Sequence, residues 1–167
     1  EEGNDILYLC QDAAELDLYG TVDGAICCLD SLNHITDYDR FCMSIERVSL
    51  FLEKDRLFIF DLNTEYKHST VLGNNTFVID TDDVYCVWQN EYKEDNTAEI
   101  NLDFFVSEGD AYYRTGESFC ERAYTKQEIE NALQKAGLKI EAVYDDMTEY
   151  MPNEKTERVI YITRKMN

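Results

Sequence analysis

Basic residues are scarce in this sequence, and long apolar runs are missing. The 15 Lys and Arg residues stand against 35 Asp and Glu residues, which gives a formal net charge of −20. A surface this acidic repels phosphate backbones, so we expect no nucleic-acid partner. No run reaches the roughly eighteen apolar residues that a membrane-spanning helix needs, and no signal peptide is visible. We therefore expect no membrane partner.

The cysteines lack the spacing of a metal site or of a disulfide framework. Six cysteines occur, but no C-x-x-C pair is among them, and most lie within apolar runs. A free cysteine in such a run behaves as a small hydrophobic residue. We therefore predict reduced thiols, no metal, and a cytoplasmic location.

The first part of the chain alternates between apolar runs and a helical pattern. Residues 6–10 ("ILYLC"), 22–29 ("VDGAICCL") and 56–63 ("RLFIFDLN") each predict a buried parallel strand. Between the last two, Phe41, Ile45 and Val48 have helical spacing, with Thr36 or Asp37 as the cap and Asp39 completing a capping box with Thr36. The strands end in polar residues, as in "CCLDSLNHI" (27–35), and ligands bind at the carboxyl ends of parallel strands.

The rest of the chain has a different pattern. Residues 76–124 contain no good helix, and alternation with polar turns predicts an antiparallel meander of three or four strands. Thr125 and Glu128 then form a capping box before a helix that Gly137 ends. Two late strands, within "LKIEAVYDD" and "ERVIYITRK", should pair antiparallel. We predict one domain, with an α/β core of residues 1–75 and 125–167 and an antiparallel β insertion at 76–124.

These pieces, in this order, resemble the class I S-adenosylmethionine-dependent methyltransferases, in particular a bacterial small-molecule branch with an antiparallel insertion. The resemblance is carried by "LYLCQDAAEL", "DGAICCLDSLNHI", "FLEKDRLFIFDLNTEYK", "ERAYTKQEIENALQKAGL" and "TERVIYITRK". It implies a truncated Rossmann-like sheet, with the third to seventh strands of the family. It also implies S-adenosyl-L-methionine as cofactor and in-line methyl transfer to a small-molecule acceptor, which needs positioning more than side-chain chemistry.

The resemblance also implies roles for particular residues. Catalysis would involve Asp30 and His34, whereas His68 is expected to be a plain surface residue. The expected cofactor-binding residues are Asp12, at the adenine amino group, Ala13, Cys28, Leu29 and Asp30. The expected substrate-binding residues are Asn33, Asn63, Tyr66, Arg122 and Tyr124, with Asp61 beside Asn63 after the same strand.

The sequence departs from the family pattern at three places. Ala13 and Ala14 stand where relatives often have Met and Arg, and Arg56 stands in a turn where the family commonly has Gly. The family's Gly-rich loop and the acidic end of its second strand do not occur in this sequence. The resemblance therefore implies an N-terminally truncated methyltransferase.

The missing strands would leave residues 6–10 without their family neighbours. We expect this segment to pair with residues 22–29, or with another chain in a homodimer formed through the exposed sheet edge. The alternative function is a non-catalytic α/β fragment or assembly subunit that has lost cofactor binding.

Overall fold

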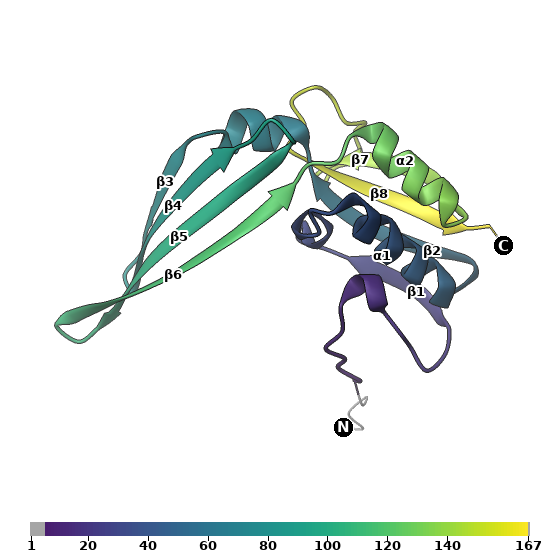
Figure 1. Cartoon of the computed structure of the whole chain (residues 1–167), viewed down its shortest axis with the longest axis horizontal. Helices are drawn as coiled ribbons and strands as arrows, with labels where there is room; N and C mark the ends of the chain where they lie inside the picture. Colours follow the sequence, from purple (N-terminus) through teal and green to yellow (C-terminus); the bar gives the residue numbers. More distant parts are fainter. Residues whose placement is uncertain (1–5, 167) are drawn as a thin grey trace.

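A computed structural model describes residues 6–166, which form two four-stranded sheets (Figure 1). Sheet A has the strand order β1-β2-β8-β7, with β1 at Val22–Cys27, β2 at Leu52–Asn63, β7 at Leu138–Asp145 and β8 at Arg158–Lys165. Sheet B has the order β3-β4-β5-β6, with β3 at Thr76–Asp80, β4 at Val84–Tyr92, β5 at Thr97–Glu108 and β6 at Ala111–Arg122. The predicted α/β class with an antiparallel insertion is confirmed.

Two helices cover the same face of sheet A. Helix α1 (Tyr38–Phe51) and helix α2 (Lys126–Lys135) lie side by side over the strands (Figure 1). Phe41 and Ile45 of α1 and Leu133 of α2 pack against Phe58 and Phe60 of β2, and all five side chains are almost fully buried. Burial of these side chains supplies the main stabilisation of this part of the fold.

The helix termini agree only in part with the sequence patterns. The predicted capping box of Thr125 and Glu128 is present, and Gly137 has the left-handed φ of 71° that favours glycine after a helix. The cap of α1 is Asp37, whose side chain accepts a hydrogen bond from the Arg40 N–H. The predicted capping box of Thr36 with Asp39 is therefore wrong, because the helix begins one residue later than that box requires.

Strand directions within sheet A follow the expected pattern. Strand β1 runs parallel to β2, whereas β8 pairs antiparallel with both β2 and β7. The predicted antiparallel pairing of the two late strands is thus confirmed. Strands β1 and β2 are the parallel pair, and their carboxyl ends lie at one edge of the sheet.

The predicted strand at residues 6–10 does not form, and its expected pairing with β1 is wrong. Residues 6–12 have no regular structure, and a single 3-10 turn, η1, follows at Ala13–Glu15. Ile6 is 68% exposed and Tyr8 is 84% exposed. Within the described residues no strand lies beside this segment, and an apolar run without a neighbouring strand has no partners for its backbone hydrogen bonds. Strand β1 is also less buried than expected, since Ile26 is 72% exposed.

The turn after α1 accommodates Arg56 without strain at that residue. The left-handed φ of 62° belongs to Asp55, the preceding residue. Arg56 itself lies within β2, where its guanidinium is 2.8 Å from Asp23 Oδ1. The positive φ that a glycine would favour is therefore found at Asp55, one residue before Arg56.

Sheet B extends away from sheet A as a long arm (Figure 1). Its strands pair only antiparallel, and β5 and β6 pair along their whole lengths, from Thr97 with Arg122 to Glu108 with Ala111. A π-helical turn, η3 (Lys67–Leu72), and a 3-10 turn, η2 (Ser31–His34), lie where the two sheets meet. Among residues 6–166 no helix is both long and apolar enough to cross a membrane.

Candidate functional site

The carboxyl ends of β1 and β2 bring together the polar residues that follow them in the sequence. Leu29 and Asp30 have positive φ values of 60° and 49°, and this turns the chain sharply at the end of β1. The Asp30 N–H donates a hydrogen bond of 2.9 Å to Asp61 Oδ2. Non-glycine residues with positive φ are uncommon and cluster at functional sites, so the turn marks this edge as a candidate site.

Arg158, which the sequence patterns did not indicate, neutralises the two aspartates. Its Nη1 donates to Asp61 Oδ2 at 2.7 Å and its Nη2 to Asp30 Oδ2 at 3.1 Å. The side chains are largely buried, with Arg158 and Asp30 each 19% exposed and Asp61 10% exposed. Asn63 Nδ2 also donates to Asp30 Oδ2. The Asp30 carboxylate thus positions the turn, and its predicted catalytic role stays a prediction.

Asn33 connects η2 with both sheets and is fully buried. Its Oδ1 accepts a hydrogen bond from the Asn63 N–H at 2.9 Å, and its Nδ2 donates to the carbonyls of Asn63 and Arg122 at 3.2 and 2.8 Å. Because all of these partners are protein backbone, Asn33 is a structural residue in this conformation. Its amide is buried and engaged in these bonds, and its substrate-binding role stays a prediction.

A buried carboxylate, Glu121 of β6, lies between the two histidines. Glu121 Oε2 is 3.0 Å from His68 Nε2, and Glu121 Oε1 is 3.7 Å from His34 Nε2. His68 of η3 is fully buried, so its prediction as a surface residue is wrong. His34 of η2 remains 45% exposed, and its ring centroid is 5.1 Å from that of Phe119. Of the predicted catalytic pair, His34 has the more accessible side chain.

Two other predicted substrate residues hold the insertion against the core. Arg122 donates to Glu128 Oε1 at 2.7 Å and to the Thr36 carbonyl at 3.2 Å, and the Tyr124 hydroxyl donates to the Ile35 carbonyl. Tyr124 is 5% exposed within the core cluster, and burial raises the pKa of its hydroxyl, with Glu128 adding to the shift and Arg122 opposing it. Arg122 is therefore engaged on the side of α2, and the substrate-binding roles of Arg122 and Tyr124 stay predictions.

The predicted adenine-binding residues lie at the start of η1, where Ala13 is the first residue and Asp12 precedes it. Asp12 caps this turn through a hydrogen bond of 2.9 Å from the Ala14 N–H to Oδ1, and its Oδ2 accepts from Arg40 Nη2 at 2.6 Å. The Asp12 side chain remains 49% exposed, and Ala13 is exposed beside it. Arg40 is a surface partner that an adenine amino group would have to displace or share. The cofactor roles of Asp12 and Ala13 stay predictions.

The remaining predicted residues divide between two pockets. A pocket of about 480 Å³ contains Cys28 and Leu29, together with Asp61, Arg158 and Met147. A second pocket, of about 600 Å³, is lined by Asn63, Tyr66 and Tyr124, and also by Ile129, Val143 and Tyr161. The sequence had predicted a single site around all of these residues.

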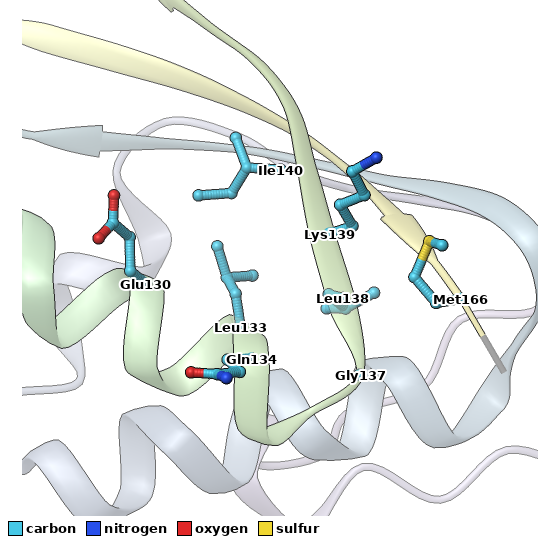
Figure 2. Close-up of a pocket in the computed structure, with 8 residues that line it drawn as sticks. All are labelled: Glu130, Leu133, Gln134, Gly137, Leu138, Lys139, Ile140 and Met166. Atoms are coloured by element: carbon cyan, nitrogen blue, oxygen red, sulfur yellow. The ribbon is translucent and has the colours of Figure 1, made fainter.

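Cys27, which also lines the first of these pockets, has a thiol whose chemistry depends on its burial. Burial raises the pKa of Cys27 to about 11, with Asp61 and Cys28 adding to the shift. Cys27 is therefore a neutral thiol at physiological pH and contributes an uncharged side chain to the lining of the pocket. A further shallow pocket, of about 360 Å³ between α2 and β7, contains none of the predicted site residues (Figure 2).

Comparisons with known proteins agree with this architecture. No protein-family model matches the chain. A Bacillus subtilis (strain 168) protein named "Putative methyltransferase YqeM" is 28% identical over 162 residues, which cover 96% of this chain and 66% of that protein. The crystal structure of an S-adenosylmethionine-dependent methyltransferase from Clostridium acetobutylicum is 36% identical, with a TM-score of 0.90, and the match covers 95% of this chain and 64% of that one.

A more distant structure shares the fold with less sequence identity. It is CalS10 with S-adenosylmethionine bound, an amino pentose methyltransferase from Micromonospora echinaspora, which is 13% identical with a TM-score of 0.69 and a match over 93% of this chain. The chain thus spans just under two thirds of the lengths of these three relatives, at 66%, 64% and 63%.

Proposed function

The chain has the fold of the class I S-adenosylmethionine-dependent methyltransferases, and from this premise we propose that the protein transfers a methyl group to a small-molecule acceptor. The observation that carries the proposal is the carboxyl edge of β1 and β2. There the turn at Leu29 and Asp30 is fixed by Asp61 and Arg158 beside a pocket of about 480 Å³. The bound cofactor supplies a methyl group already activated on a sulfonium.

The residues at this edge fit part of that cofactor. Leu29 is 75% exposed and Cys28 is exposed in the pocket, so both side chains are accessible to an apolar or sulfur-bearing group. The half-exposed carboxylate of Asp12 can accept a hydrogen bond from an adenine amino group if Arg40 gives way. This sequence contains no Gly-rich loop to approach the methionine part, and the match leaves about a third of each relative uncovered. We propose that the remaining contacts come from residues outside these 167.

Additional residues would also cover an apolar surface on the face of sheet A that lies opposite the helices. Ile26 is 72% exposed there, and Ile59 and Ile160, on the same face, are only half-buried. An apolar surface of this kind normally lies against other protein. We propose that it packs against the same additional residues, and that the apolar segment 6–10 pairs with a strand from them or from a second copy.

Calorimetric titration with S-adenosylhomocysteine tests the cofactor assignment. We expect saturable binding to the protein that carries these additional residues as well, and its loss in Leu29→Arg, which places a charged side chain at the mouth of the pocket. Leu50→Arg is the matched control, because Leu50 is 57% exposed on α1, outside this pocket. If the protein with those residues neither binds the compound nor gains thermal stability from it, the alternative would be favoured instead, namely a non-catalytic protein or assembly subunit.

A further inference from the structure

The most unusual polar group outside the two aspartates is Glu121, because both of its oxygens face a histidine. His68 Nε2 is 3.0 Å from Oε2 and His34 Nε2 is 3.7 Å from Oε1, while Asn63 Nδ2 donates to Oε2 at 3.2 Å. The Glu121 side chain is only 7% exposed. The groups facing it come from η2, η3 and β2, and Lys67 and Asp30 lie one step further, both bonded to Asn63. A buried carboxylate with this many donors is held in one orientation.

The chemistry of a carboxylate fixes the protons on the rings that face it. Burial raises the pKa of Glu121, but the hydrogen bond and charge of His68, the hydrogen bond of Asn63 and the charge of His34 outweigh it, so that its pKa lies below the usual value. Glu121 is therefore ionised at neutral pH and can only accept hydrogen bonds. The Nε2 atom of His68, which is within hydrogen-bond distance of Glu121, must then carry a proton. His34 Nε2 is 3.7 Å from the carboxylate, too far for a hydrogen bond, but the negative charge favours a proton on this nitrogen, and in a neutral ring that leaves Nδ1 with a free lone pair.

The two histidines differ in what their Nδ1 atoms can reach. His68 is fully buried, and its Nδ1 has no hydrogen-bond partner among the described residues. No small molecule can approach it, so His68 serves as a second support for Glu121. His34 is 45% exposed and lies in the loop that follows Asp30, with its ring against Phe119. Of the two rings that face Glu121, His34 is therefore the one that an acceptor molecule can reach.

We propose that Glu121 is a positioning residue that holds His34 with Nδ1 directed to the acceptor, and that the acceptor is therefore an amine or a hydroxyl compound. The inference rests on the function proposed above. The acceptor's nitrogen or oxygen uses its lone pair to bond to the methyl carbon, and the electron pair of the broken carbon–sulfur bond stays on sulfur. The proton that the acceptor loses passes to His34 Nδ1. The resulting imidazolium is stabilised by the ionised Glu121, as in other sites where a carboxylate orients a histidine base.

A first experiment tests the pairing without cofactor or acceptor. The chain has only two histidines, so His34→Gln and His68→Gln assign the ring nitrogen signals in an NMR spectrum. In Glu121→Gln the carboxylate no longer favours a proton on Nε2, so we expect the nitrogen shifts of the neutral His34 ring to show a larger share of the Nδ1–H tautomer than in wild type. Glu117→Gln is the matched control, since Glu117 is exposed on the same face of β6, and it should leave the tautomers of both rings unchanged. An unchanged His34 tautomer in Glu121→Gln would overturn the proposal.

A second experiment tests the reaction, using S-adenosylmethionine and a panel of simple amine, alcohol and thiol acceptors with S-adenosylhomocysteine formation as the readout. We expect amines or alcohols to react and His34→Ala to lose about 10²–10⁴-fold in kcat, with part of the rate restored by free imidazole. Glu121→Gln should lose less, about tenfold or more, with little change in the acceptor KM and with S-adenosylhomocysteine binding intact.

The outcomes separate the two proposals. Normal rates in His34→Ala, or a protein that methylates only thiols, would overturn the role of His34 and Glu121 while leaving methyl transfer in place. Failure of the protein to bind S-adenosylhomocysteine even with the additional residues present would overturn the proposed function, and the proposal on His34 would fall with it whatever the NMR measurement shows.

Discussion

Sheet A and sheet B are stabilised in different ways although they belong to one chain. Sheet A has a face under α1 and α2, and Phe58, Phe60 and Leu62 of its strand β2 are each 1% exposed. Sheet B, within residues 6–166, has no helix over its far end (Figure 1). Ala98 and Ile100, near the junction, are almost fully buried, but Ile79 and Tyr113, further out, are 48% and 59% exposed. The candidate site therefore lies between the well-packed sheet A and the arm formed by sheet B, and the arm depends for its stability on contacts at the junction of the two sheets.

The largest expected effect is on stability, when one phenylalanine is removed from each sheet and the two losses are compared. Phe60→Ala should lower the free energy of unfolding by about 3–5 kcal/mol, because it leaves a cavity between Phe58 and Tyr161, whose rings are 4.9 and 5.1 Å away. Phe105→Ala in sheet B should cost about 1 kcal/mol, since this ring is half-buried and loses an edge contact with Tyr85 at 6.3 Å and the contact of its face with the Arg114 guanidinium at 5.9 Å. Urea unfolding followed by circular dichroism measures both changes.

Equal losses from the two substitutions would contradict the comparison, because they would show that the arm is packed as well as the helix-covered sheet. The single tryptophan, Trp88, lies in β4 of sheet B. Its fluorescence therefore reports on the arm separately from the helical signal of α1 and α2.

The next largest loss of stability is expected at the junction of the two sheets, where Asn33 bonds to both. Asn33→Ala should cost about 2–3 kcal/mol, because the buried N–H and carbonyl of Asn63 and the carbonyl of Arg122 would lose their partner. The expected signature is a Trp88 transition at lower urea than the transition of the helices. Asn131→Ala on the exposed side of α2 is the control and should change stability by less than about 0.5 kcal/mol. Coincident transitions in Asn33→Ala would mean that other contacts hold the arm.

The elements that the sequence predicted correctly are those that local patterns specify. The capping box of Thr125 and Glu128, the helical spacing of Phe41 and Ile45, and the alternation in the insertion each depend on residues close together in the chain. The meeting of Asp30 with Asp61 was also predictable, because parallel strands place their carboxyl ends at one edge.

The parts that were missed depend on long-range register. Glu121 reaches His34 and His68 only because β6 ends beside η2 and η3, and Arg158 reaches Asp30 from a strand 128 residues later. An apolar run such as residues 6–10 predicts burial but does not say which strand will lie beside it. The buried position of His68 had no local signal either, since a π-helical turn rather than an apolar pattern places it.

The smallest expected effect is a pH dependence that arises at the junction and not in sheet A. Burial raises the pKa of Glu121, but the hydrogen bonds of His68 and Asn63 and the charges of His68 and His34 outweigh it, so the pKa is lowered in the folded state. Its contribution to stability is therefore present above the usual carboxyl pKa of 4.5 and is lost as the pH falls through the lower, folded value. Urea midpoints measured from pH 7 to pH 3 should show a gap between wild type and Glu121→Gln that narrows as the solution is acidified.

Glu117→Gln serves as the control here as well, because Glu117 is exposed and should show no such gap. The circular dichroism and Trp88 signals should also differ, with the acid effect larger in the Trp88 transition, since Glu121 belongs to the arm and supports it. A gap that stays constant with pH would show that Glu121 stabilises the fold by packing alone. In that case its ionisation would not couple the arm to His34, and the difference between the two sheets would be one of packing only.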